Sequence, residues 1–243
     1  MQKPIRPLIQ PGRSSKHKPG ASLVLGLGLV VLVAGNGVYA ATLPAAGLSS
    51  DSGVDLQQES ASSEVKFMIS WIMDSGDNHG MPYAIIDKVN AKVFVFDKTG
   101  HIQGAAPVLL GLARGDNSVP GIGERKLSTI RPEERSTPAG RFVSSLSSDV
   151  SGKQILVIDY ASSLSLHPLA KGTPAERRAQ RLESPTSEDN RISYGCINVP
   201  VKFYEKIVSP TFTRTNGLVY ILPETSKAID MFGSSSLGSS KPK

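Results

Sequence analysis

The amino-acid sequence predicts a mainly β domain with short helices on its flanks. Runs rich in valine, isoleucine, phenylalanine and tyrosine recur between residues 82 and 223, with turn residues between them. The helical patterns are short and do not alternate regularly with the strands, so no β–α–β rhythm is present. Hydrophobic residues make up 39% of the 243 residues, which is enough for one good core.

The first strands are expected to follow one another through tight turns. Strand-like runs lie at Tyr83–Asp87, Lys92–Phe96 and Ala106–Gly111, separated by the turn-like stretches "KVNA" and "DKTG". The second run alternates valine with phenylalanine, so both faces of that strand should be partly buried.

The later strands come after a long segment of low apolar content, residues 112–136. Strand character resumes in "GRFVSSL", "KQILVIDY" and "SLSLH", and a last buried strand is predicted in "GLVYILPE". A second polar segment spans 170–190. A short helix is predicted after Pro200, with Pro210 just past its end.

The first 40 residues are expected to direct export. Five basic residues and no acidic residue accompany the apolar run at 21–35, and Val38-Tyr39-Ala40 resembles a signal-peptide cleavage site. The run is shorter than the ~20 residues that span a bilayer comfortably. We therefore expect 1–40 to be a signal peptide, with an uncleaved membrane anchor as the alternative. In both cases the folded part lies outside the cytoplasm, in the periplasm or cell envelope.

The rest of the chain divides by composition into a linker, a domain and a tail. Residues 41–63 are rich in serine, glycine, alanine and glutamine and predict a flexible linker. The domain is expected over 64–225, and residues 226–243 are expected to be a disordered tail.

The domain is expected to begin with a helix. Val65, Met68, Ile69 and Ile72 recur at helical spacing, so this stripe is expected to pack on the core or on a partner. Ser62 or Ser63 would cap the start of this helix, and Gly76 would end it.

The net charge of +6 does not indicate a nucleic-acid partner. Without the five basic residues of the first 40, 22 basic residues remain against 21 acidic ones. A nearly neutral mature chain lacks the cationic surface that phosphate backbones require.

Cys196 is the only cysteine. In an exported protein a single cysteine indicates an intermolecular disulfide or a reactive thiol, and a buried inert thiol is the alternative. Gly195 before it permits an unusual backbone conformation. If Cys196 lies at the entry of the following helix, the free N–H groups there would lower the thiol pKa and hold an oxyanion.

A cysteine nucleophile also needs a base. Of the four histidines, His17 lies in the signal region, and His79 and His101 lie in turn-like stretches. His167 ends an alternating strand and would point into a cleft, so it is the candidate base, with a structural role as the alternative.

These residues resemble the L,D-transpeptidase (YkuD-like) catalytic domain. The family signature is a histidine, a spacer, and then Ser/Thr-His-Gly-Cys-hydrophobic-Asn/Arg, which corresponds here to His167 and "SYGCIN" at 193–198. "STPAGRF" is similar to the family's Thr-Pro-x-Gly-x-Phe element. "IIDKVNAKVFVFDKTGHI" and "GLVYILPE" are similar to its opening hairpin and closing strand, so the likeness runs from about 83 to 223.

The resemblance implies a β-sandwich fold and an exported cysteine acyltransferase acting on peptidoglycan stem peptides. Cys196 would form a thioester and an amine would resolve it, giving a 3–3 cross-link, while His167 would move the protons. No metal or cofactor is implied. Membrane contact is expected only through an uncleaved N-terminal segment, and no oligomeric state is predicted.

The resemblance also assigns supporting residues. Ser193 and Asn198 would orient the cysteine loop, and the backbone N–H groups of Tyr194, Gly195 and Cys196 are candidates for an oxyanion hole. We also expect Arg125 and Arg191 to contact the substrate.

Two departures from the family pattern keep alternatives open. Tyr194 replaces the second histidine of the signature, and the 28 residues between His167 and Cys196 exceed the usual spacer. Transfer to water would make the protein an L,D-carboxypeptidase or amidase instead. A catalytically inactive cell-wall-binding protein is the third possibility.

Overall fold

The computed structural model describes residues 9–10 and 60–233. The predicted signal peptide, apart from residues 9–10, most of the predicted linker and the end of the predicted tail lie outside the described residues. Within the described ranges, no helix is both long enough and apolar enough to cross a membrane.

Nine strands of the described chain form one mixed sheet. Along the sheet the order is β10 (Ile197–Val199), β8 (Leu164–Pro168), β7 (Gln154–Asp159), β6 (Gly140–Asp149), β11 (Gly217–Ile221), β2 (Tyr83–Asp87), β3 (Lys92–Phe96) and β4 (Ile102–Pro107), while β1 (Ile9–Gln10) pairs with β6. A separate two-stranded sheet joins β5 (Leu110–Gly111) to β9 (Arg191–Ser193).

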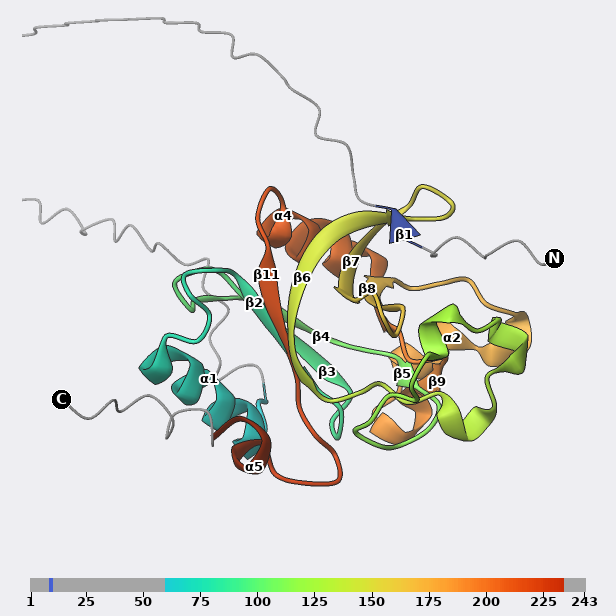
Figure 1. Cartoon of the computed structure of the whole chain (residues 1–243), viewed down its shortest axis with the longest axis horizontal. Helices are drawn as coiled ribbons and strands as arrows, with labels where there is room; N and C mark the ends of the chain where they lie inside the picture. The colour runs from blue at the N-terminus through green and yellow to red at the C-terminus, as the bar shows by residue number, and fades with distance from the viewer. Residues whose placement is uncertain (1–8, 11–59, 234–243) are drawn as a thin grey trace, which may run out of the picture. The chain divides into compact units, whose positions relative to one another are not determined.

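The long strand β6 belongs to both halves of the large sheet. Its first part, Gly140–Ser144, pairs with β11, and its second part, Ser145–Ser148, pairs with β7. Figure 1 shows this strand curving from one half to the other. Apolar side chains from both halves, among them Val93, Leu166 and Val219, share one buried cluster. The mainly β, sandwich-like fold predicted from the sequence is confirmed.

One continuous helical segment covers an edge of this cluster. It consists of α3 (Val201–Phe203), a π-helical turn (Tyr204–Val208) and α4 (Ser209–Phe212), and Tyr204, Val208 and Phe212 are buried in the core. The prediction that Pro210 lies past the helix end is wrong. Pro210 lies inside the continuous segment, directly after the π-helical turn, where the departure from regular α-helical hydrogen bonding accommodates its missing N–H.

A second cluster lies on the other face of β2, β3 and β11. On β3, Val93 and Val95 enter the first cluster while Phe94 and Phe96 enter the second, as their alternation predicts. The helix α1 (Ser63–Ser75) covers the second cluster.

The ends of α1 agree with the prediction from the sequence. The hydroxyl of Ser62 accepts the Val65 N–H, and Gly76 ends the helix at φ 65°. Ser62 also donates to Asp87, so the last two residues of the predicted linker belong to the domain.

The prediction of a disordered tail from residue 226 is wrong for its first part. Ala228–Phe232 form helix α5, which lies beside α1 in Figure 1. The N–H of Ala228 donates to Glu64 on α1 at 2.7 Å, and Phe232 packs 6.2 Å from the ring of Trp71. The apolar side chains of Ala228 and Phe232, four residues apart on one face of this helix, are thus buried against the domain.

The predicted strand at Ala106–Gly111 is divided in the structure. β4 starts earlier and ends at Pro107, after which the Val108 N–H donates to Ala91 and Leu109 pairs with Asn198. The chain then leaves the large sheet so that β5 can pair with β9.

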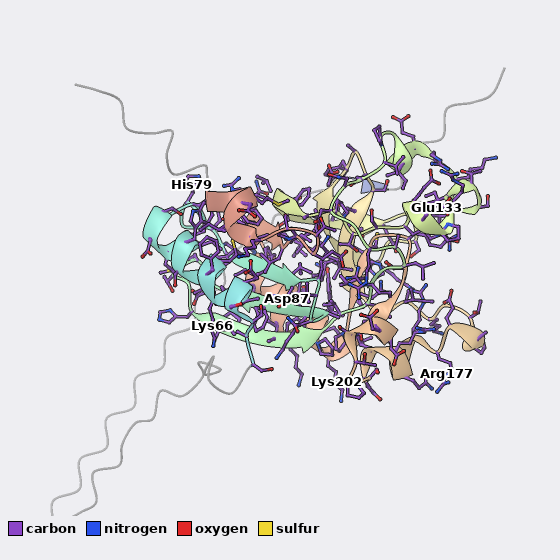
Figure 2. All side chains as sticks on the ribbon, turned by 90° about the horizontal axis from the view of Figure 1, so that it is seen from below. Lys66, His79, Asp87, Glu133, Arg177 and Lys202 are labelled. Atoms are coloured by element: carbon purple, nitrogen blue, oxygen red, sulfur yellow. The ribbon has the colours of Figure 1, made fainter. Side chains whose placement is uncertain are left out.

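The two polar segments of the sequence fold into short helical turns. Residues 112–136 contain the 3₁₀ turns Ile122–Glu124, Leu127–Thr129 and Pro132–Glu134. Residues 170–190 contain the 3₁₀ turns Pro174–Glu176 and Ser187–Asn190 and helix α2 (Arg178–Leu182). In Figure 2, Glu133 and Arg177, one from each segment, lie toward the same end of the molecule, away from Lys66 and His79.

Candidate functional site

The parallel pairing of β8 with β10 brings Cys196 and His167 to one face of the sheet. Leu166 lies opposite Ile197, and His167 lies opposite Asn198. Leu166 and Ile197 are fully buried in the core. Because side chains alternate along a strand, the residues beside them point away from the core. His167, Cys196 and Asn198 therefore share the outer face.

Cys196 does not lie at the entry of a helix. Strand β10 follows it directly, and α3 begins only at Val201. The condition under which helix N–H groups would act on the thiol is therefore not met, because the residues after Cys196 pair with β8 instead.

The thiol contacts polar groups of β8 and of the residue just before this strand. Its Sγ lies 3.5 Å from the Ser165 hydroxyl and 3.4 Å from the Ser163 carbonyl oxygen. Burial raises the pKa of Cys196, but a hydrogen bond and the charge of His167, together with Ser165, outweigh burial and leave this pKa below its ordinary value. The thiol is therefore prepared to ionise.

His167 is held by a backbone carbonyl. Its Nδ1 lies 2.8 Å from the Pro168 oxygen, which can only accept, so Nδ1 carries a proton and Nε2 is left to interact with the thiol. Burial lowers the pKa of His167, but the hydrogen bond and charge of Cys196, with the Pro168 contact, raise it above its ordinary value. Together the two shifts favour a thiolate–imidazolium pair.

Side chains hold the loop that carries the cysteine. Ser193 donates to the Cys196 carbonyl at 2.6 Å and accepts the Gly195 N–H at 3.1 Å. Asn198 donates to the same Cys196 carbonyl at 3.4 Å. The Gly195 N–H is thus occupied and does not serve as an oxyanion donor in this conformation. The N–H groups of Tyr194 and Cys196 have no partner in the described part of the chain.

Thr137 supports this loop from below. Its hydroxyl donates to the Gly195 carbonyl at 2.7 Å and accepts the Gly111 N–H at 2.8 Å, and the residue is fully buried. Gly195 has φ 131°, and a Cβ there would lie 2.9 Å from the Ser136 carbonyl. The position therefore requires glycine.

A buried cluster of charged groups lies on the other side of Thr137. Lys88 donates to the Thr137 carbonyl at 2.9 Å and to Asp116 at 2.7 Å, and lies 3.5 Å from Glu224. Arg191 pairs with Glu224 at 2.6 Å and is only 7% exposed. The prediction that Arg191 contacts the substrate is wrong, because its guanidinium is committed to this cluster.

A pocket of about 590 Å³ opens beside the two predicted site residues. Cys196, His167, Tyr194 and Arg125 are among its lining residues. The guanidinium of Arg125 binds both carboxylate oxygens of Glu134, at 2.9 and 3.1 Å, and its contact with the substrate stays a prediction. The ring of Tyr194 lies 4.1 Å from the guanidinium carbon of Arg135.

Ser165 belongs to the site although the sequence prediction leaves it out. The signal was present in the alternation of "SLSLH", because Ser165 and His167 are two apart and so share a face. Among the described residues, no group of three or more His, Cys, Asp or Glu side chains is placed to hold a metal ion.

No family model matches the chain, and no curated protein matches it. Among solved structures, the chain is similar to an L,D-transpeptidase of Enterococcus faecium, with 14% identity and a TM-score of 0.35 over 58% of this chain and 50% of the other. The catalytic domain of an E. faecium L,D-transpeptidase gives 17% identity and a TM-score of 0.33 over 58% of this chain and 96% of the other.

The helical cell shape determining protein Pgp2 of Campylobacter jejuni gives 15% identity and a TM-score of 0.38 over 67% of this chain and 56% of the other. The chain spans about half the length of the first L,D-transpeptidase structures that it matches. These similar structures are thus L,D-transpeptidases and a cell-shape protein.

Proposed function

We propose that this protein is an exported L,D-transpeptidase that joins peptidoglycan stem peptides through a thioester on Cys196. The observation that carries the proposal is the pairing of Cys196 with His167 at an open pocket, with the thiol pKa lowered by the histidine. A polarised thiol beside an imidazole is the arrangement that cysteine acyl transfer requires.

In the first step, Cys196 gives its proton to Nε2 of His167, and the thiolate attacks the carbonyl carbon of a stem-peptide bond. A C–S bond forms and the carbonyl π electrons move to oxygen. The unoccupied N–H groups of Tyr194 and Cys196 are the available donors for that oxyanion. When the tetrahedral intermediate collapses, the C–N bond breaks, and the amine of the terminal D-alanine leaves with the proton held by His167.

In the second step, the amine of another stem peptide attacks the thioester carbonyl. His167 takes the proton of the attacking amine, the C–S bond breaks, and the proton returns to the sulfur. The products are one new amide bond and the free enzyme. The same thioester attacked by water would give hydrolysis, so the acceptor distinguishes transferase from hydrolase.

The choice of peptidoglycan rests on the signature shared with the L,D-transpeptidase family and on the predicted export signal. The presence of a single cysteine agrees with this proposal. A nucleophilic thiol in an oxidising compartment must stay free, and the chain has no second cysteine with which Cys196 could form a disulfide. The L,D-transpeptidases and cell-shape protein among the similar structures are consistent with the proposal, which does not depend on them.

The test is incubation of the purified protein with disaccharide-tetrapeptide muropeptides, with products identified by mass spectrometry. We expect cross-linked dimers that lack one alanine, and none with Cys196→Ala. Tripeptide monomers without dimers would replace the transferase with a hydrolase. Binding without any product in either protein would replace it with a cell-wall-binding role.

A further inference from the structure

The segment 170–190, which lengthens the connection between His167 and Cys196, is built around one ion pair. Arg178 donates to Glu176 at 2.7 Å, and Glu176 also accepts the Thr173 N–H at 3.1 Å. A Cβ on Gly172 would collide with both side chains of this pair. Leu182 of α2 is only 5% exposed. The segment therefore has a defined structure that places Arg178.

Arg178 reaches the strand pair that carries the site. Its Nη1 donates to Oδ1 of Asn198 at 3.3 Å, and the Ala170 N–H donates to the same oxygen at 3.2 Å. Asn198 is only 1% exposed and lies opposite His167 across β8 and β10. The Arg178 side chain is itself only 12% exposed.

We propose that Arg178 is a positioning residue for acyl transfer, which fixes the amide of Asn198 and places a permanent cation beside His167. The proposal deepens the proposed function and rests on it. No assignment from the sequence gave Arg178 a role.

The first effect is on orientation. Two donors on Oδ1 leave the Asn198 side chain one orientation, in which Nδ2 faces the Cys196 carbonyl at 3.4 Å. That contact and the Ser193 hydroxyl hold the cysteine peptide group. Loss of Arg178 leaves the Ala170 N–H as the one remaining donor to this oxygen, so the amide and the cysteine peptide group that it contacts are held less firmly. Small displacements of a nucleophile reduce turnover strongly.

The second effect is on the proton held by His167. Burial lowers the pKa of His167, Cys196 and the Pro168 carbonyl raise it, and the Arg178 cation lowers it. Arg178 itself does not line the pocket, and the charged residues that line it beside His167 are Arg125, Asp149, Lys153 and Lys171. Because His167 must release its proton to the leaving amine, a cation that weakens its hold on the proton assists that step.

The experiment measures alkylation of Cys196 by iodoacetamide against pH in the full chain, beside muropeptide turnover. Cys196 is the only cysteine, so mass spectrometry reports this thiol alone. The variants are Arg178→Met, Arg178→Lys and the matched control Arg181→Met. Arg181 lies on the same helix, but it donates to the Glu176 and Asp189 carbonyls, at 2.9 and 3.0 Å, and not to Asn198.

In Arg178→Met we expect the alkaline step of the profile, which reports loss of the imidazolium proton, to move to higher pH. Turnover should fall about tenfold. Arg178→Lys keeps the charge and should keep the alkaline step, and Arg181→Met should keep both step and turnover. A wild-type profile and turnover in Arg178→Met, or an equal change in Arg181→Met, would overturn the proposal. If the wild-type protein does not turn over muropeptides, the proposed function fails while the alkylation profile still decides the role of Arg178.

Discussion

The buried hydroxyl of Thr137 donates a 2.7 Å hydrogen bond to the carbonyl of Gly195, the residue before the cysteine. The same hydroxyl accepts the Gly111 N–H, so one side chain connects the cysteine loop to the end of β5. Thr137 thus fixes the loop to the core, and the side chains of Ser193 and Asn198 hold it through the Cys196 carbonyl.

Replacing Thr137 with valine should preserve packing and remove this connection. Valine leaves the Gly195 carbonyl and the Gly111 N–H without a partner, and each unsatisfied buried group costs about 1–3 kcal/mol. We expect a lower free energy of unfolding by denaturant titration and a turnover reduced by about tenfold or more. Thr137→Ser keeps the hydroxyl and should remain close to wild type in both measurements. Equal losses in the two variants would contradict the role of the hydrogen bonds.

Removing the imidazole should make Cys196 less reactive at neutral pH. Burial alone raises the pKa of Cys196, and the hydrogen bond and charge of His167 bring it below its ordinary value. In His167→Gln the opposing effect is lost, so the pKa rises and less thiolate is present at pH 7. We expect alkylation at pH 7 to slow about tenfold or more. The control is His101→Gln, because that side chain is 80% exposed in a turn. An unchanged rate in His167→Gln would contradict the pairing.

Alanine at position 195 should damage both stability and activity. Its backbone would remain at φ 131°, and its Cβ would press against the Ser136 carbonyl. Strain of this kind costs about 1–3 kcal/mol. Gly80→Ala is a matched control, since Gly80 also has a positive φ, 68°, but open space around its missing Cβ. Thermal unfolding should show a smaller loss in Gly80→Ala, and muropeptide turnover should fall only in Gly195→Ala.

The buried charges around Lys88 should make the free energy of unfolding decrease at low pH. Burial raises the pKa of Asp116, but hydrogen bonds from Lys88, Thr225 and the backbone outweigh it and lower the pKa from 3.8 to about 2. A lowered folded-state pKa stabilises the fold above the unfolded value, and that contribution is lost as pH falls from about 4 toward 2. Denaturant titration across this range should show a smaller loss in Asp116→Asn than in wild type, because the contribution of Asp116 is absent while that of other carboxylates with a lowered pKa, such as Glu134, remains.

Asp116→Asn should also lower stability at pH 7, by about 3 kcal/mol, because it leaves Lys88 with a weaker partner inside the protein. Removing both charges with Lys88→Met in the Asp116→Asn background should cost less than the sum of the two single changes. An additive result would show that the two side chains do not interact.

Local patterns in the sequence were sufficient to predict much of the fold. β2 and β3 begin and end at the predicted residues, because alternating apolar residues between turn signals determine them locally. Helix α1 likewise starts and stops at its predicted cap residues. The separation of β4 from β5 was not predictable in this way, because β5 leaves the sheet for a partner about eighty residues later in the chain. Helix α5 is stabilised by its contacts with α1, and these contacts could not be predicted from its short sequence.

The candidate site, like the fold, was only partly predictable from the sequence. A residue motif predicts Cys196 and His167 as the reacting pair, and in the structure both line one pocket. Arg191 was misassigned because a charged residue is expected at the surface, whereas Glu224 compensates its charge in the interior. Arg178 lies in the polar segment 170–190, and its inward position follows from the folded structure, in which its side chain is 12% exposed and donates to Asn198.

The register between β8 and β10 has a consequence for how this site tolerates change. The juxtaposition of His167 with Asn198 comes from hydrogen bonding between two parallel strands, so it does not depend on how many residues connect them. The connection can therefore be lengthened without changing the strand register, provided that the contacts of Ala170 and Arg178 with Asn198 are kept. Insertions after Arg178 and before Arg191 thus offer a way to change what the pocket accepts while the register of the two strands stays the same.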